Sequence, residues 1–286
     1  MPHNDERQEF SSARANPLRS AENLLMSYSV LMSVYAKEKP DFLRLAIESM
    51  LNQTVQTDDF VLVCDGPLTP ELEAALGCYI LNVVRLETNQ GLPFALNFGL
   101  GNCKHDIVAR MDSDDIAASN RCELQLALMS EYDIVGGMVE EFARTPGDLH
   151  RFRATAERDV SRFAKRRNPF NHPTVMFRKS KVQAVGGYEN TYPLAEDYHL
   201  WVRMLMNGCK GYNIPETLVN MRIGNGLYNR RSGLDYFKMI MSLRKWMLKT
   251  GFSNWQDYCV CTIGHAASCL SPEKMRKWLY EKRLRV

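Results

Sequence analysis

Short apolar, β-rich runs alternate with helical segments over the first 115 residues of this chain. Such alternation predicts βαβ units, and hence an α/β fold built on a central, mostly parallel sheet flanked by helices. Right-handed crossovers place every strand-to-helix turn at one edge of the sheet, so we expect Tyr35, Asp65, 89–91 and 112–115 to converge there. The predicted strands are 28–35, 60–64, 82–86 and 106–111, and the predicted helices between them are 40–52, 70–76 and 92–100.

Three carboxylates directly follow the strand predicted at 106–111, namely Asp112, Asp114 and Asp115. Carboxylates at the C-terminal edge of a sheet are costly unless a cation compensates them. Ligands of open α/β sheets bind at that edge, and oxygen donors suit Mg²⁺ or Mn²⁺ completed by phosphate oxygens and water. The run therefore predicts a divalent-cation site. The alternative is an Asp-rich turn in which Asp115 or Ser119 caps the helix that follows.

The second half of the chain is less regular. It has an expected helix at 121–129 and strands at 133–137 and 174–177. A further helix is expected from Glu196 to a C-cap at Asn207-Gly208. The first helix, 40–52, is expected to turn one face inward, made of Phe42, Leu45, Ala46, Ser49 and Met50. Residues 1–27 are polar, lack the apolar core of a secretory signal, and are expected to form a disordered arm.

Composition excludes some classes of function. With 45% hydrophobic residues the chain can build a sizeable core, and a net charge of +3 is too small to indicate a nucleic-acid partner. The eight cysteines show no C-x-x-C pair and no zinc-like spacing with histidine, and no apolar run is long enough to span a bilayer. These features favour a reducing cytoplasm.

The C-terminal part is strongly basic, because residues 229–286 hold 12 Lys and Arg against 4 Asp and Glu. Such a segment favours an anionic partner, of which a phospholipid surface is the simplest. We expect a basic amphipathic helix lying on a membrane. The alternatives are that it packs back on the rest of the chain or forms a homodimer contact. Its apolar residues are Tyr236, Phe237, Ile240, Leu243 and Met247, interleaved with Lys238, Arg244, Lys245 and Lys249.

Six ordered motifs between Tyr28 and Arg231 resemble family 2 glycosyltransferases with the GT-A fold, of the bacterial kind that builds capsule, exopolysaccharide or O-antigen. The motifs are 29–35, 49–54, 63–66, 89–92 with 95–97, 112–114 and 196–197. The resemblance implies a Rossmann-like catalytic domain over 28–231. It would consist of a nucleotide-binding half, 28–115, and an acceptor-binding half, 116–231. The basic helical tail would be 232–286.

The resemblance implies a role for each residue of the donor side. Ser33 and Tyr35 would lie against the nucleotide base, and Asp65 would accept the N3–H of uracil, which suits a UDP-sugar. Asn89 and Gly91 would shape a loop near the ribose or diphosphate. The plain alternatives are that Asp65 is a turn residue and that the loop merely starts a helix.

In the same family, Asp114 would bind the Mn²⁺ or Mg²⁺ ion, and Asp112 would hold the ribose, the ion or one of its waters. Arg222, Arg230 and Arg231 are candidates to bind the diphosphate, for which guanidinium groups are suited. The alternative for these arginines is a solvated basic turn.

The family's reaction is an inverting displacement in which an acceptor hydroxyl attacks the anomeric carbon as nucleoside diphosphate leaves. Asp197 matches the general base that this hydroxyl needs, although a carboxylate at a helix start also serves as a cap. Glu196 would raise the pKa of that base or bind acceptor. His172 and Tyr188 would contact acceptor, although His172 equally suits a role in ordering its loop.

Relatives often carry Arg-x-His after the base helix, where this chain has Gly224 in place of the histidine. Either the ion has fewer protein ligands or His172 or His199 takes that place. A nucleotidyltransferase would want a glycine-rich loop after the first strand, which 36–39 is not. A non-catalytic nucleotide-sugar-binding subunit would not need Asp197. The expected acceptor is a glycan carried on undecaprenyl diphosphate, at the cytoplasmic face of the inner membrane.

Overall fold

The computed structural model of this chain describes residues 26–153, 155–157, 159–224 and 233–270. The predicted N-terminal arm lies outside the described residues except for its last two positions. Arg230, Arg231 and the basic segment 271–286 also lie outside them.

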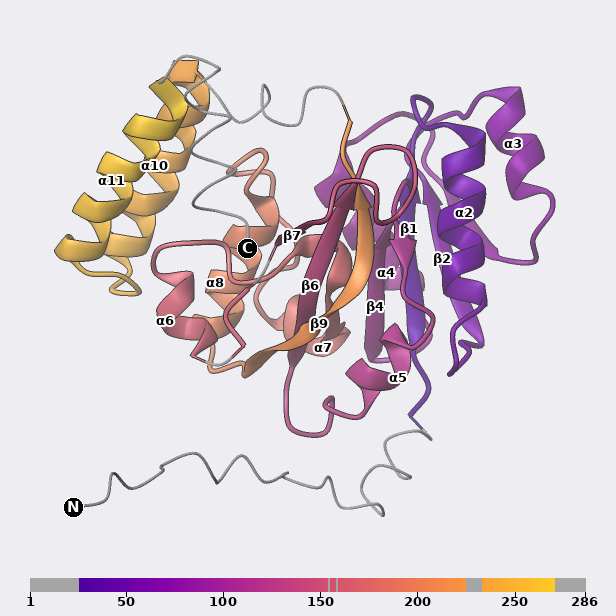
Figure 1. The fold of residues 1–286 in the computed structure, drawn as a ribbon, viewed down its shortest axis with the longest axis horizontal. Coiled ribbons are helices and arrows are strands. Elements are labelled where there is room, and N and C mark those ends of the chain that lie inside the picture. Colours follow the sequence, from indigo (N-terminus) through magenta and orange to yellow (C-terminus); the bar gives the residue numbers. More distant parts are fainter. Residues whose placement is uncertain (1–25, 154, 158, 225–232, 271–286) are drawn as a thin grey trace, which may run out of the picture.

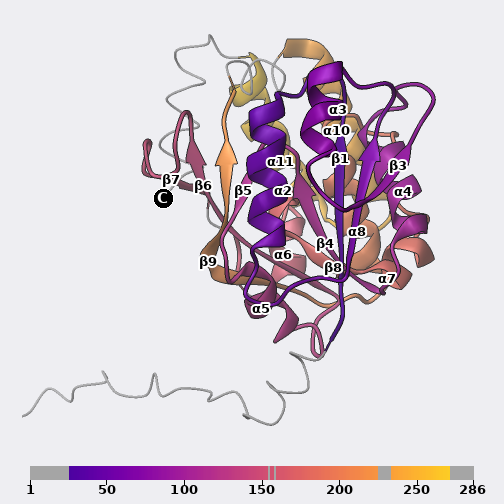
Figure 2. The same cartoon turned by 90° about the vertical axis from the view of Figure 1, so that its right-hand side faces the viewer.

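A mixed nine-stranded sheet forms the centre of the described part (Figures 1 and 2). Its strands run in the order β3-β2-β1-β4-β8-β6-β9-β5, and β7 pairs with β6. The alternation predicted for the first half is confirmed. The strands there are β1 (Ser29–Val34), β2 (Asp59–Cys64), β3 (Asn82–Arg85) and β4 (Ile107–Asp112), and the helices are α2 (Pro40–Leu51), α3 (Pro70–Leu76) and α4 (Leu92–Asn102).

The strand order reverses between β1 and β4. From β1 the chain moves to β2 and β3 on one side and then returns to place β4 on the other, all four strands being parallel. In open α/β sheets the crevice at the carboxyl end of such a switch point is where ligands bind. Ser33 and Asp112 are register partners at that end. The fold therefore places the acidic run beside the loop after β1, which is predicted to border the nucleotide.

The second half extends the sheet with antiparallel and parallel strands. The long strand β9 was not predicted. It pairs with β6 in parallel through a register shift that leaves Pro215 and Glu216 without partners, and this explains how a strand tolerates proline. The elements are β5 (Ile116–Ala117), α5 (Arg121–Leu126), β6 (Ile134–Phe142), β7 (Arg151–Arg153), α6 (Val160–Ala164), the 3₁₀ turn η1 (His172–Thr174), β8 (Met176–Arg178), α7 (Lys179–Ala184), α8 (Glu196–Met206) and β9 (Gly211–Arg222).

Two apolar clusters cover the two faces of the sheet. One contains the buried side chains of α2 and α3, and the other those of α4 and α8. The inward face of α2 differs from the prediction, because Leu45 is exposed and Phe42 only partly buried. The helix is turned so that its buried residues are Leu43, Ala46, Ile47 and Met50.

Two C-terminal helices follow, α10 (Gly233–Lys249), which lies beside α8, and α11 (Trp255–Leu270), which lies on the outer side of α10 (Figure 1). The apolar residues Ile240, Leu243 and Met247 of α10 are buried against α8 residues, so this face packs on the protein, which was one of the open alternatives. Arg244 is buried too, which corrects the expectation that it belongs to a solvated basic face. No described helix is both long and apolar enough to cross a bilayer.

Candidate active site

The turn after β2 and the loop before α4 are joined by one buried carboxylate. Asp65 Oδ1 accepts a hydrogen bond from Gln90 N at 2.7 Å, and Oδ2 accepts from Asn89 Nδ2 and Gly91 N, each at 3.0 Å. Gly91 has φ 86° and ψ 159°, a conformation that only glycine adopts readily. In this structure Asp65, predicted to read a base, therefore also fixes the loop of Asn89 and Gly91.

A second pair of loops meets across the β1–β4 switch point. Ser113 Oγ donates to Glu38 Oε2 at 2.9 Å, which ties the acidic run to the loop after β1. Tyr35 opens that loop and is 44% exposed at the carboxyl end of β1. Two pairs of the loops expected to converge are therefore joined by hydrogen bonds, the turn after β2 with the loop before α4, and the loop after β1 with the acidic run.

The carboxylates of the acidic run have different environments. Asp112 forms a two-point ion pair with the buried guanidinium of Arg110, one of whose bonds is 2.6 Å long. Burial, followed by the charges of Asp112 and Glu38, raises the pKa of Asp114 to about 7. Burial, followed by the charges of Asp114 and Asp112, raises the pKa of Asp115 well above its usual value, and Oδ2 of Asp115 has no hydrogen-bond partner among the described residues.

Arg222, at the end of β9, is stacked against the acidic run. Its backbone N donates to Asp115 Oδ1 at 2.7 Å, and its Nε donates to the carbonyl of Asp114 at 3.0 Å. Its guanidinium carbon lies 3.7 Å from the ring centroid of Phe42 and 4.4 Å from that of Phe142. The side chain expected to bind diphosphate is thus held between two rings beside the run.

The donor set at this edge fits a divalent cation. A partly buried carboxylate with a raised pKa beside two further carboxylates is a site that lacks positive charge. Mg²⁺ and Mn²⁺ need only one or two protein carboxylates when phosphate and water complete their coordination. Asp114 and Asp112 supply that number. The described residues contain no cluster of three or more acidic, histidine or cysteine side chains arranged as metal ligands, so a cage made by the protein alone is not present in this part.

Asp197 lies in the first turn of α8, facing the segment before η1. Its Oδ2 accepts from Asn168 Nδ2 at 2.7 Å, and its Oδ1 accepts from the backbone N of Tyr198 at 2.7 Å. The carboxylate is thus oriented by a neighbouring amide and by the start of its own helix, an arrangement compatible with both a base and a cap.

Tyr188 connects the two halves of the site. Burial raises its pKa, and among the charges acting on its hydroxyl are those of Arg110 and Asp112 at the end of β4 and of Glu196 and Asp197 at the start of α8. The acidic run and the predicted base, although far apart in sequence, therefore both contribute to the electrostatic environment of Tyr188.

Two contacts hold Tyr188 in place. Its backbone N and O both bond to the side-chain amide of Asn97 on α4, at 2.8 Å each. Its hydroxyl lies 3.1 Å from His172 Nε2. Burial and the charge of Arg110 lower the pKa of His172 well below 6.5, so its ring is neutral at pH 7. His172 therefore contacts the Tyr188 side chain, which is compatible with ordering this loop and leaves its expected contact with acceptor a prediction.

His199 lies elsewhere. Its ring stacks edge-on against Tyr192 and Trp246 at centroid distances of 4.8 and 4.6 Å, in the cluster between α8 and α10. The idea that His199 takes the place of the family histidine is therefore wrong, because its ring is packed among aromatic side chains instead of facing the acidic run.

Three residues of the site were not singled out from sequence. Arg110 could have been found as a cation two positions before Asp112 in a buried strand, since such residues share a face. The sequence around Glu38 and around Asn168 does not indicate a role in the site. Each joins the site through a hydrogen bond to a residue more than 25 positions away, Ser113 and Asp197 respectively.

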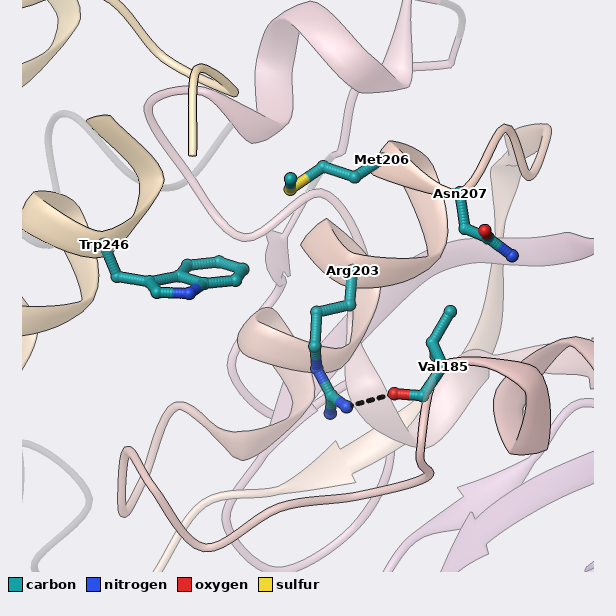
Figure 3. Close-up of a pocket in the computed structure, with 5 residues that line it drawn as sticks. All are labelled: Val185, Arg203, Met206, Asn207 and Trp246. Atoms are coloured by element: carbon teal, nitrogen blue, oxygen red, sulfur yellow. Dashed lines mark hydrogen bonds between the residues drawn. The ribbon is translucent and has the colours of Figure 1, made fainter. Parts of the chain in front are cut away.

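A separate hollow of about 260 Å³ lies between α8 and α10 (Figure 3), and its wall contains no residue of the candidate site. Arg203 at its side is engaged with the carbonyl of Val185 at 2.5 Å and with Glu189 at 2.7 Å. The lining residues are Val185, Arg203, Met206, Asn207 and Trp246.

Comparison with known proteins defines the class. Residues 29–185 match the sequence model described as Glycosyl transferase family 2. The chain is 38% identical over 266 residues to the Escherichia coli UDP-Gal:alpha-D-GlcNAc-diphosphoundecaprenol beta-1,3-galactosyltransferase, covering 90% of this chain and 96% of the relative. It is 38% identical over 265 residues to the amylovoran biosynthesis glycosyltransferase AmsE of Erwinia amylovora, covering 89% and 98%.

Solved structures share the fold. S. aureus TarS residues 1–349 in complex with UDP-GlcNAc superpose with a TM-score of 0.65 at 16% identity, covering 85% of this chain and 73% of that one. This chain spans 44% of a longer TarS chain. The mannosyltransferase PcManGT of Pyrobaculum calidifontis, in complex with GDP-Man and Mn²⁺, gives a TM-score of 0.56 at 15% identity, covering 91% and 88%.

The protein is a glycosyltransferase of the GT-A type. It belongs to glycosyl transferase family 2, which settles the enzyme class against the nucleotidyltransferase alternative.

Proposed function

We propose that this enzyme transfers a sugar, with inversion, from a UDP-sugar to a hydroxyl of a lipid-linked glycan in bacterial surface polysaccharide assembly. The observation that carries the proposal concerns Tyr188, which is held by His172 and by Asn97 of α4. The charges of the acidic run and of Asp197 both act on its hydroxyl. The donor's diphosphate would lie on the side of the acidic run, and the attacking hydroxyl on the side of Asp197.

On the donor side, the nucleotide would lie at the carboxyl ends of β1 and β2. Ser33 and Tyr35 would border the base, with Asp65 and its loop closing the other side. The Oδ1 atom of Asp65, which accepts one hydrogen bond from Gln90 N, keeps a lone pair for the N3–H of uracil. Gly91 leaves the loop open, because a Cβ there would meet no atom within 4 Å.

At the diphosphate, Asp114 and Asp112 would hold a Mn²⁺ or Mg²⁺ ion. Such an ion, when bound, neutralises the charge that develops on the leaving diphosphate. Arg222 would keep Asp114 in place through its carbonyl contact. Arg110 fixes the orientation of Asp112 and offsets part of the negative charge of the run.

At the acceptor, Asp197 would take the proton of the attacking hydroxyl. Asn168 holds Oδ2 of this carboxylate and the Tyr198 amide holds Oδ1, so the group is oriented before substrate arrives. Glu196, Tyr188 and His172 would border the acceptor sugar. A lipid-linked acceptor, as in the name of the E. coli relative, would place the enzyme at the cytoplasmic face of the membrane.

The test is sugar transfer from UDP-galactose and other UDP-sugars to a synthetic GlcNAc-diphosphate-lipid, with the product's anomeric configuration read by NMR. Asp197→Asn should lower kcat at least about a hundredfold, the usual contribution of a general base. Asp235→Asn is the matched control, because Asp235 also lies in the first turn of a helix, α10. Equal activity of the two variants, or a product with retained configuration, would contradict the proposal.

A further inference from the structure

One face of α11 is fixed to the catalytic domain. Asp257 Oδ1 accepts from Arg166 Nε at 2.6 Å, and Cys261 Sγ lies 3.5 Å from the carbonyl of Arg166. His265 Nε2 lies 3.4 Å from the buried Arg244 guanidinium of α10. These three α11 residues are four apart and therefore share one side of the helix.

The opposite face of α11 is apolar and exposed. Residue 259 follows Asp257 by two positions, which is about 200° around a helix, so the row through Cys259 and Ile263 points away from the domain. Trp255, Val260 and Ile263 are 68%, 51% and 71% exposed. The exposed face, which we call the α11 face, comprises Trp255, Gln256, Cys259, Val260, Ile263 and Gly264, and it has no charged side chain.

The α11 face lies at the outer edge of the molecule. In Figure 1 α10 stands between α11 and α8, and the sheet lies farther away. The apolar side of α10 is used against α8. Of the two C-terminal helices, α11 is therefore the one whose apolar side is exposed and available to bind a partner.

Charge distinguishes between the possible partners. Lys238, Lys245 and Lys249 of α10 are exposed, and the sequence 271–286 that follows α11 has 6 Lys and Arg against 2 Glu. A second copy of this chain would bring like charges together. An anionic lipid surface offers both an apolar phase for the helix face and opposite charge for the lysines and arginines.

We propose that the α11 face inserts into the interface of an anionic phospholipid membrane. The inference deepens the peripheral location in the proposed function and rests on it. It also moves the membrane contact from the apolar side of α10, where the sequence pattern suggested it, to α11.

The test is co-sedimentation with vesicles of equal parts phosphatidylethanolamine and phosphatidylglycerol. Ile263→Glu should weaken partitioning by at least about tenfold, since withdrawing one aliphatic side chain from an apolar phase costs about that factor. Ile80→Glu is the matched control, because Ile80 is an exposed isoleucine too but lies between α3 and β3. The Ile80→Glu substitution makes the same change in net charge as Ile263→Glu. It should weaken partitioning of the protein onto vesicles by less than about threefold.

An equal loss of vesicle binding in both variants would show that net charge alone drives binding, and would overturn the proposal. A dimer seen by analytical ultracentrifugation without vesicles, and dissociated by Ile263→Glu, would also overturn it in favour of a second copy. Transfer to a detergent-dispersed acceptor separates this inference from the proposed function. It should be unchanged in both variants, and its absence from the wild type would count against the proposed function while leaving the vesicle result standing.

Discussion

Arg110 and Asp112, two residues apart on β4, point to the same face of the sheet and form a two-point ion pair. Arg110 is almost completely buried, so the pair is part of the core as well as of the site. Asp112 therefore has a structural partner, whereas Asp114 sits beside like charges with a pKa raised to about 7. Replacing each of these two carboxylates by an amide should therefore change the free energy of unfolding in opposite directions.

Asp112→Asn should lower the free energy of unfolding by about 3 kcal/mol, because it leaves a buried guanidinium without its counter-charge. Asp114→Asn should raise it by about 1 kcal/mol at pH 8 without added metal, because a partly buried carboxylate near other carboxylates is removed. Urea unfolding of both variants in EDTA checks this. A loss of stability in Asp114→Asn would contradict the assigned environments.

The Glu38–Ser113 hydrogen bond joins the loop after β1, which we propose borders the nucleotide, to the acidic run. It should therefore couple the binding of UDP and Mn²⁺. Glu38→Gln and Ser113→Ala should each weaken the mutual enhancement of the two ligands by about 1 kcal/mol, and the double variant should lose little more. Titration of UDP with and without Mn²⁺ measures this. Additive losses would show that the two residues act separately.

Gly187 holds Tyr188 against α4. It has φ 72°, and a Cβ there would lie 2.5 Å from Asn97 Oδ1. Gly187→Ala should cost about 2 kcal/mol of stability. Gly101→Ala, in α4 with open space around it, should instead add about 0.5–1 kcal/mol. Thermal unfolding distinguishes the two, and equal shifts in Tm would contradict the geometry.

Acid should loosen α11, because burial and the charge of Arg244 lower the pKa of His265 to about 4. A histidine with a pKa lower in the folded than in the unfolded chain leaves stability intact above pH 6.5. It removes stability as pH falls from 6.5 toward 4. At pH 5 the loss is about 2 kcal/mol.

His265→Gln should reduce this loss, whereas His150→Asn, at an exposed position directly before β7, should not. Urea unfolding midpoints between pH 8 and 5 measure the difference. A pH profile identical to that of the wild type in His265→Gln would exclude the role of this ring.

The pattern of residues predicted the parallel half of the fold because strand and helix periods there are clear, and because crossover handedness fixes which loops meet. It did not predict β9, whose Pro215 and Glu216 read as a loop until their place at a register shift is known. The inward face of α2 was misjudged for a related reason. Phe42 is apolar, yet it serves as a stacking surface for Arg222, a contact across 180 residues.

The sequence pattern also predicted which carboxylates lie at the edge of the sheet, but it could not predict their ion-pair and hydrogen-bond partners. Asp112 with Arg110 and Asp197 with Asn168 are contacts made by the tertiary fold. Arg230 and Arg231 lie outside the described residues, so their expected contact with diphosphate stays a prediction.

Calorimetric titration of UDP with Mn²⁺ into the wild type, Asp114→Asn and Asp197→Asn tests the central claim most directly. We predict Mn²⁺-dependent UDP binding that is lost in Asp114→Asn and kept in Asp197→Asn, although the latter has lost transfer. Wild-type affinity for UDP and Mn²⁺ in Asp114→Asn would contradict the account.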